Sequence, residues 1–331
     1  MLKPLFTKSG IFVLAGVVLV WALPLRAAPS SAADWLSHMQ QALAHKSYRG
    51  VLVFMGNGGA VTYQLVVSQG KYARMTALTG PQREILRGPK AVIRLRNGGN
   101  AMVIRGMGGG ASPLPFPPAT RVDLSKLKRH YALELGGSSR VAGRAVQLMQ
   151  IVPRDKWRYG YRVWIGAQSG LPLRSELVTS AGKTLEQAFF THLSLIQAPA
   201  AESAIGAKAV SILAHASKGD NSSEGACSGK NTPAFNFKQL PPGFHVTKTV
   251  CESAPAGELP VTHVLITDGL ATVSLFVAAH PAGGPALVGA TAVGSVHAVG
   301  RLEGSYALTA MGDVPIGTVA RIAHSLVIGG K

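Results

Sequence analysis

A two-residue alternation of apolar and polar side chains constrains the fold most. It returns in about ten segments between residues 48 and 195, and this period places successive side chains on opposite faces of a β-strand. Pairs such as Gly58-Gly59 and Ala181-Gly182 predict tight turns between neighbouring strands. The predicted strands are Tyr48–Met55, Ala60–Val67, Lys71–Leu78, Glu84–Arg87, Ala91–Arg96, Ala101–Arg105, Ala132–Leu135, Ser139–Ala142, Ala145–Val152, Tyr159–Ile165, Leu173–Thr179 and Thr184–Leu195.

Two helices accompany these strands. Residues Ala33–Lys46 carry apolar side chains at helical spacing, and Asp34 is placed to cap the first turn. The Gly and Pro content of Gly106–Pro118 predicts a long mobile loop. A shorter helix, with Ser125 as its cap, is expected after it. A helix and so many antiparallel strands predict an α+β chain whose first domain is an open, strongly curved β-barrel.

A second, smaller domain follows a polar linker. The run Asp220–Gly225 has linker composition, and an Ala-rich helix is expected before it at Ala200–Ala216. We divide the chain into a signal peptide (1–32), a first domain (33–200), a linker (201–232) and an α+β second domain (233–331), because 331 residues suggest about two domains. The second domain is predicted to hold strands Phe235–Leu240, Phe244–Cys251, Val261–Thr267, Ala271–Ala278, Gly294–Leu302 and Ser305–Met311 and a closing helix Pro315–Ile328.

The first residues are typical of a secretory signal peptide. Lys3 and Lys8 precede the uncharged apolar stretch Ile11–Leu25, which is shorter than the ~20 residues of a membrane-spanning helix. The expected cut lies after Ala27 or after Ala32, and an uncleaved membrane anchor is the alternative. Cleavage would deliver the mature chain to the periplasm.

The excess of positive over negative charge lies entirely in the first part of the mature chain. Residues 28–200 hold 22 Lys and Arg against 7 Asp and Glu, a net charge of +15, whereas residues 201–331 hold 8 of each. This asymmetry predicts an anionic partner. Export makes an anionic lipid or an acidic peptide the expected partner rather than nucleic acid. The alternative is that the charge only keeps the protein soluble.

Cationic and aromatic residues suggest where such a partner binds. In Pro153–Trp164 four cations interleave with four aromatic side chains, a combination that suits anionic groups on an apolar ligand. Cross-strand aromatic pairs at a sheet edge are the alternative. In Val92–Arg96 arginines alternate with apolar residues, so one face of that strand is basic. The candidate binding residues are Arg83, Arg87, Arg94, Arg96, Arg154, Arg158, Tyr159 and Trp164.

No set of residues in the sequence predicts catalysis, a metal site or a cofactor. The motifs G-x-S-x-G, H-E-x-x-H and G-x-x-x-x-G-K-[ST] are absent. Glu176 and Glu186 fall on neighbouring predicted strands, but we expect them to be solvated or paired with Arg174 and Lys183. The two cysteines, Cys227 and Cys251, predict a structural disulfide in an exported protein, and two buried thiols are the alternative.

Short motifs along the whole mature chain resemble those of the RseB/MucB family, in the family's order. In the first domain they are Asp34–Leu36, Gly80–Glu84, Ser139–Arg144, Pro153–Asp155, Arg158-Tyr159, Gly170–Leu173 and Leu185-Glu186. In the second domain they are Leu240–Phe244, Asp268–Leu270 and Val314–Thr318. The insertion Gly106–Pro118 departs from the family pattern.

The resemblance implies a function and a fold. Family members are periplasmic negative regulators of the sigma-E type envelope-stress response. They bind the periplasmic region of a single-pass anti-sigma factor (RseA or MucA), shield it from proteolysis, and sense lipid-bearing ligands such as lipopolysaccharide or lipoproteins. The first domain would be LolA/LolB-like. A periplasmic lipoprotein or lipid carrier of the LolA type is the alternative function, and neither function is enzymatic or requires a cofactor.

Overall fold

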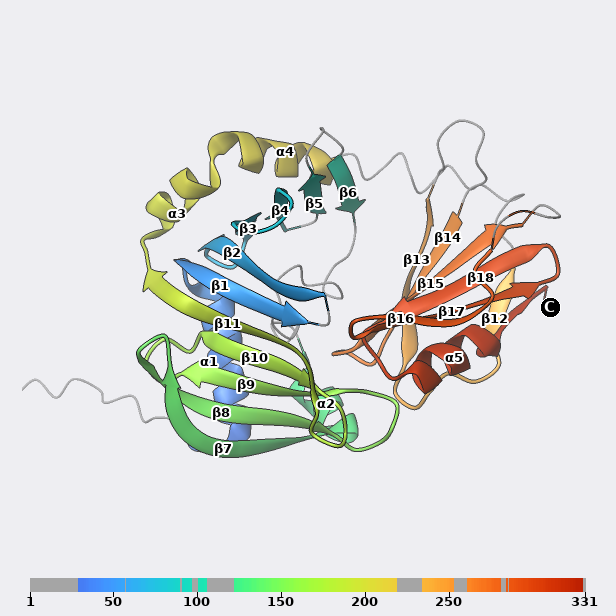
Figure 1. Ribbon diagram of the computed structural model, residues 1–331, viewed down its shortest axis with the longest axis horizontal. Coiled ribbons are helices and arrows are strands. Elements are labelled where there is room, and N and C mark those ends of the chain that lie inside the picture. Colours follow the sequence, from blue (N-terminus) through green and yellow to red (C-terminus); the bar gives the residue numbers. More distant parts are fainter. Residues whose placement is uncertain are drawn as a thin grey trace, which may run out of the picture.

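The computed structural model describes residues 29–56, 58–89, 91–96, 101–105, 122–218, 234–252, 261–280, 284 and 286–329. The chain is α+β and folds into a larger sheet domain and a smaller one that lie side by side (Figure 1). Most of the expected signal peptide, the segment Gly106–Pro118 and Cys227 lie outside the described residues. No helix within the described ranges is long and apolar enough to cross a membrane.

The first domain is built on one curved, entirely antiparallel sheet, as the alternation predicts. Its eleven strands lie in the order β6-β5-β4-β3-β2-β1-β11-β10-β9-β8-β7, so nearly every strand pairs with its neighbour in sequence. The strands are β1 Tyr48–Gly56, β2 Gly59–Ser68, β3 Tyr72–Ala77, β4 Arg83–Arg87, β5 Ala91–Arg96, β6 Ala101–Arg105, β7 Tyr131–Val141, β8 Arg144–Pro153, β9 Gly160–Gly166, β10 Pro172–Val178 and β11 Thr184–Leu195.

Strand β7 is continuous where two strands are predicted. Its pairing with β8 shifts register between Leu135 and Ser138, which is the mark of a β-bulge. Gly136 lies in this bulge, and a Cβ there would come within 2.5 Å of Leu148 Cδ2. The glycine therefore permits a close approach of β7 and β8 and does not end the strand.

Helix α1 (Ala32–His45) lies against one face of the sheet and buries Trp35, Leu36 and Met39 in the main core of the first domain. Its N-cap is Ser31, and Asp34 completes a capping box instead of capping alone. The hydrogen bonds from Ser31 lower the pKa of Asp34. A signal-peptide cut after Ala32 would remove the cap, so we expect the cut after Ala27.

The N-cap of helix α2 (Leu124–His130) lies two residues before the predicted one. Asp123 is the cap, because its Oδ1 accepts the backbone N–H of Ser125 at 2.9 Å. Ser125, the predicted cap, is thus a donor within the first turn.

The opposite face of the sheet is covered by two further helices, α3 (Ala198–Ile205) and α4 (Ala207–Lys218), seen in yellow in Figure 1. Gly206, at φ 89°, separates them. Their small and apolar side chains pack on Val66, Leu86 and Ile93 of the sheet. Residues 201–218 therefore belong to the first domain and not to the linker, which is a correction of the predicted boundary.

The second domain is a six-stranded antiparallel sheet in the order β13-β14-β15-β18-β17-β16, with one helix packed on it. Strand β16 was not predicted, because its short residues lack alternation and all are exposed. The predicted closing helix ends early, and its last residues form β19, which pairs with β12. The elements are β12 Phe235–Phe237, β13 His245–Glu252, β14 Val261–Thr267, β15 Thr272–Ala279, β16 Gly289–Val293, β17 Val296–Glu303, β18 Tyr306–Gly312, α5 Ile316–Ser325 and β19 Leu326–Ile328.

Candidate functional site at the joint between the domains

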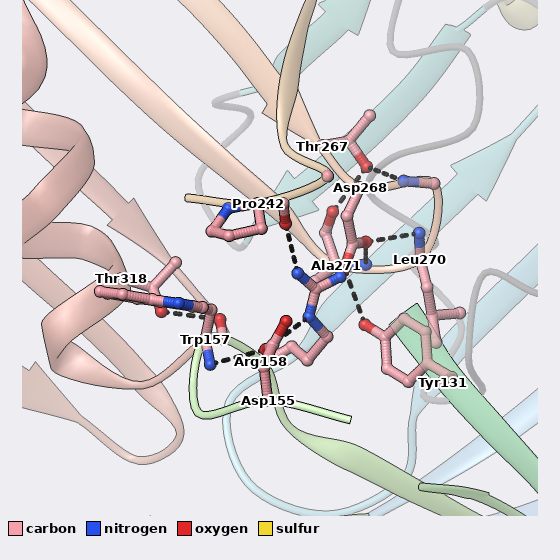
Figure 2. A network of polar contacts seen from close by, with 12 residues as sticks. Tyr131, Asp155, Trp157, Arg158, Pro242, Thr267, Asp268, Leu270, Ala271 and Thr318 are labelled. Carbon is pink, nitrogen blue, oxygen red and sulfur yellow. Dashed lines mark hydrogen bonds and ion pairs between the residues drawn. The ribbon is translucent and has the colours of Figure 1, made fainter. Parts of the chain in front are cut away.

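The connection between β8 and β9 reaches from the first domain to the second (Figure 2). Asp155 organises this connection, because its Oδ1 accepts the backbone N–H of Trp157 at 2.9 Å and Nε–H of Arg158 at 3.0 Å. A carboxylate that bonds the N–H two residues on holds the backbone in an Asx-turn. Trp157 and Arg158 are consequently presented to the second domain.

Arg158 is buried between the two domains. Its side chain and that of Asp268 are both 0% exposed, and Nη1 donates to Asp268 Oδ2 at 2.6 Å. Nη2 donates to the carbonyl oxygen of Pro242 at 2.5 Å. The guanidinium also lies 5.4 Å from the ring of Tyr131 and 5.2 Å from that of Phe244. A buried charge must be paired and hydrogen-bonded. The second domain supplies the opposite charge, from Asp268, and a further hydrogen-bond acceptor, from Pro242.

Asp268 receives hydrogen bonds from both domains. Its Oδ1 accepts the backbone N–H groups of Leu270 and Ala271 at 2.9 and 2.8 Å, and its Oδ2 accepts the hydroxyl of Tyr131 at 2.9 Å. Burial, together with the charge of Asp268, raises the pKa of Tyr131 well above its usual range. Tyr131 therefore stays a neutral donor, and the carboxylate is satisfied without water.

Leu270, at the β14–β15 turn, crosses the boundary between the domains. It belongs to the second domain in sequence, yet it is 2% exposed within the main core of the first domain. Asp268 fixes the turn through its two backbone bonds, and Figure 2 shows Leu270 on the same side as Tyr131. The tip of this hairpin thus occupies part of the apolar interior of the curved sheet.

Trp157 makes the reciprocal insertion. Its ring packs against the core of the second domain, and the guanidinium of Arg321 lies 5.1 Å from it. Its carbonyl oxygen accepts the hydroxyl of Thr318 at 2.6 Å, and Thr318 is fully buried near the start of α5. Leu270 of the second domain therefore lies in the core of the first, and Trp157 of the first domain packs against the core of the second.

A third contact holds two carboxylates on one hydroxyl. Ser295 Oγ lies 2.7 Å from Glu186 Oε1 of β11 and 2.5 Å from Asp313 Oδ1 of the second domain. A hydroxyl has one hydrogen to donate, so Ser295 can donate it fully to only one of the two carboxylates. Partial burial, and then the nearby charge of Asp313, raise the pKa of Glu186 despite the bond from Ser295. The contact is therefore more favourable when Glu186 is protonated, because its repulsion with Asp313 is then removed.

We call these three contacts the interdomain joint. It contains Tyr131, Trp157, Arg158, Glu186, Asp268, Leu270, Ser295, Asp313 and Thr318. The charged groups of the joint bind one another and not a ligand. Their arrangement is therefore suited to holding the two domains together. In the part of the chain that the structure describes, no three His, Cys, Asp or Glu side chains gather closely enough to hold a metal ion.

Three of the predicted binding arginines, Arg83, Arg87 and Arg94, share one face of the sheet. Arg83 pairs with Arg96 across β4 and β5, and Arg94 pairs with Ile85, which packs against the core that holds α1. Arg94 is exposed while Ile93 is 1% exposed, as the alternation predicts. Arg87 is half-buried and donates to the carbonyl oxygen of Gly70 at 3.1 Å.

The other predicted residues lie elsewhere. Arg158 is buried in the joint instead of lining a cationic rim, because Asp268 and Pro242 take up its donors. Arg154 is exposed nearby, and Tyr159 lies with its ring 6.4 Å from that of His297. Trp164 lies under the guanidinium of Arg174 on the β9–β10 part of the sheet. The eight residues thus form no single site.

Of the two glutamates, Glu176 is buried and paired with Arg174 at 2.5 Å, as predicted. The register places it opposite Gln187, while Glu186 pairs with Leu177, so the two glutamates point to opposite faces. Because Cys227 lies outside the described residues, its disulfide with Cys251 of β13 stays a prediction that a free-thiol assay can test.

The joint could not be found from sequence patterns. Arg158 and Asp268 are 110 residues apart, and no local spacing links them. The only signal was that Arg158-Tyr159, Asp268–Leu270 and Val314–Thr318 belong to motifs of the resemblance.

The fold and the joint define a two-domain protein in which a curved eleven-stranded sheet is locked to a smaller six-stranded one. Residues 31–209 match the MucB/RseB N-terminal domain and residues 229–327 match the MucB/RseB C-terminal domain. The chain therefore belongs to the MucB/RseB family.

Similar proteins are regulators by name. The sigma factor AlgU regulatory protein MucB of Pseudomonas aeruginosa is 31% identical over 307 residues, which are 90% of this chain and 91% of that protein. The sigma-E factor regulatory protein RseB of Haemophilus influenzae is 28% identical, over 89% and 91% of the two chains. A crystal structure of MucB in complex with MucA(peri) matches with a TM-score of 0.65 and 28% identity, over 91% of this chain and all of that one.

Proposed function

We propose that this protein is a periplasmic negative regulator that binds the periplasmic region of a membrane anti-sigma factor. The observation that carries the proposal is the match to MucB in complex with MucA(peri), because it spans 91% of this chain and includes both domains. The motifs of the resemblance run through both domains as well, and several of them meet in the joint. The bound anti-sigma region is shielded from proteolysis while the complex lasts.

Capture from the native periplasm tests the partner directly. The intact mature protein, tagged at its C-terminus, should retain a single-pass membrane protein with an extended periplasmic region. The isolated periplasmic region should then resist a periplasmic protease when this protein is present in excess. If the capture recovers only lipoproteins, the alternative function of a LolA-type carrier is favoured. If the protease cleaves the periplasmic region equally fast with and without this protein, the shielding role is wrong.

We also propose that the first domain senses an acylated, anionic ligand. Supporting this, one face of β4 and β5 carries Arg83, Arg87 and Arg94, and the interior of the same sheet is apolar. Each CH₂ of a buried chain contributes about 0.8 kcal/mol. Leu270 already occupies part of that interior, so an acyl chain and the hairpin tip compete for the same space.

Competition tests the sensor. By linkage, a ligand that prefers the partner-free form must weaken partner binding by the same factor, so lipid A or an acylated peptide should displace the anti-sigma region. Charge reversal at Arg83 and Arg94 should weaken lipid binding more at low salt than at high salt, because exposed charges are screened. Arg129→Glu on α2 is the matched control. Partner affinity that is indifferent to saturating lipid would refute the sensor and leave the anti-sigma proposal intact.

A further inference from the structure

Strand β16 leaves one edge of the second-domain sheet open. It is the last strand in the sheet order and lies beside β17. All of its residues are exposed, and Val293 at its end is 80% exposed. Its pairing with β17 runs without a register shift, and its sequence Gly289–Val293 contains no charged residue and no proline. A regular, uncharged edge of this kind is a template for pairing with another chain.

Alternate residues of β16 turn their backbone groups away from the sheet. The β16–β17 loop has two residues, so Val293 and Val296 form the hydrogen-bonded pair that closes it. Hydrogen-bonded and non-hydrogen-bonded pairs alternate along an antiparallel ladder. Ala290 and Ala292 therefore point their N–H and C=O groups outward. Within the described ranges, no backbone group of another segment bonds to them there.

The other three sheet edges carry features that oppose such pairing. Strand β13, at the opposite edge of the same sheet, has a bulge between Val246 and Lys248, and β7 has its bulge at Gly136. Strand β6 ends in Arg105 and lies beside helix α4 (Figure 1). Bulges, charged side chains and covering helices are the means by which proteins prevent pairing at an edge. Strand β16 has none of them, which indicates that this edge is kept for a partner.

The open edge begins at the interdomain joint. Ser295, in the β16–β17 loop, contacts Glu186 of the first domain and Asp313 of the second. A strand added to β16 would therefore have one end beside the first domain, so a single extended segment could contact both domains. The two carboxyl groups disfavour an acidic residue at that end of the segment.

We propose that β16 binds an extended segment of the anti-sigma periplasmic region, which adds a seventh strand to the six-stranded sheet. In such strand addition the main-chain hydrogen bonds give affinity, and alternate side chains give specificity. The bound segment is free of proline in its pairing residues, since proline lacks the N–H that the ladder needs. This inference rests on the proposed function and adds where part of the partner binds.

Hydrogen exchange of the mature protein, followed residue by residue by NMR, tests the edge. With the anti-sigma region at saturation, the amides of Ala290 and Ala292 should exchange at least about tenfold more slowly than in the free protein. The amide of Thr291, which already faces β17, is the internal control and should change less. Unchanged exchange of Ala290 and Ala292 in a complex that does form would overturn the proposal and leave the proposed function intact. Protection of both amides in the free protein would assign the edge to a second copy or to this chain itself, and would also overturn it.

A proline at the edge gives an independent test. Ala292→Pro removes an outward N–H and none of the bonds to β17, so the edge strand should tolerate it. It should weaken anti-sigma binding about tenfold, the loss of one hydrogen bond. Ala292→Ser keeps the N–H and should bind like the wild type, and urea unfolding checks that both variants are folded. Wild-type affinity in a folded Ala292→Pro would overturn the proposal, whereas no binding by the wild-type protein itself would overturn the proposed function.

Discussion

Arg158 and Asp268 form a fully buried pair whose members come from different domains. Such a pair contributes little beyond an apolar equivalent, but loss of one member leaves an unpaired buried charge. The pair is therefore better suited to fixing the relative position of the domains than to raising stability. Tyr131 completes the hydrogen bonding of Asp268, and Pro242 and Asp155 complete that of Arg158.

We predict that Arg158→Met lowers the free energy of unfolding by about 3–5 kcal/mol, since Asp268 is left buried and unpaired. Arg158→Met combined with Asp268→Asn should cost less than the sum of the two single changes, because neither charge of the pair is then left buried without its partner. Urea unfolding of the four proteins measures the coupling. Arg154→Met, on the exposed neighbour, should change stability by less than about 0.5 kcal/mol. If the change in unfolding free energy of the double variant equals the sum of the two single changes, Arg158 and Asp268 are not energetically coupled.

Glu186 predicts a pH dependence of the joint. Its pKa is raised in the folded protein, so the folded state binds the proton more tightly than the unfolded state does. The stabilisation is fully present below the ordinary glutamate value and is lost as the pH rises through the raised value. Relative to Glu186→Gln, the wild-type protein should therefore lose unfolding free energy from about pH 4.5 upward. Glu134→Gln, at an exposed position on β7, should not reproduce this difference, and parallel pH profiles for wild type and Glu186→Gln would contradict it.

At the residue scale the sequence predicted what alternation controls and missed what depends on distant contacts. Arg94 and Ile93 point to opposite faces because strand geometry requires it. Arg158 reads like its exposed neighbours Arg154 and Lys156, and only the contact with Asp268 makes it a buried group.

Among the elements, the β14–β15 hairpin links the two cores most directly. Its tip residue Leu270 lies in the first core, while Val264, Ile266 and Val273 of the same two strands lie in the second. Movement of the second domain would withdraw Leu270 and expose apolar surface inside the curved sheet. The hairpin is thus the element through which a ligand of the first domain would act on the second.

We predict that Leu270→Ala increases the binding of an apolar fluorescent probe and lowers the free energy of unfolding by about 2–5 kcal/mol. The physical reason is that the truncated tip leaves apolar space in the first core. Leu302→Ala on β17, where the side chain is 45% exposed, should change neither quantity appreciably. Equal probe fluorescence in wild type and Leu270→Ala would show that the tip does not close the interior.

The sequence predicted the strands and helices well wherever the apolar and polar residues alternated regularly. Strands β1 to β6 and β8 to β11 and helix α1 lie within a few residues of their predicted ranges. The failures have local causes: Gly136 permits a bulge that reads like a strand end, and β16 carries only short side chains without alternation. One Ala-rich helix was predicted where α3 and α4 lie, but it was assigned to the linker, because its apolar face is largely alanine and its burial depends on the sheet beneath.

The whole molecule combines a basic domain with a neutral one through reciprocal insertions. Residues 28–200 carry the net charge of +15, while the second domain supplies Asp268, Leu270 and Asp313 to the joint. The sequence predicted two domains and the asymmetry between them, but relative placement depends on contacts between residues far apart in the chain. We infer that the anti-sigma region recognises the two domains together.

The most direct test is the affinity of a labelled anti-sigma periplasmic region for the intact mature protein, for residues 29–218 and 234–331 as separate fragments, and for Arg158→Met with Asp268→Asn. Fluorescence anisotropy should show the tightest binding for the intact protein, and each fragment should bind at least about tenfold more weakly, a loss of about 1.4 kcal/mol. The double variant should lie between them, because its joint is loosened but not cut. Full affinity in the first-domain fragment alone would contradict recognition by the joined domains.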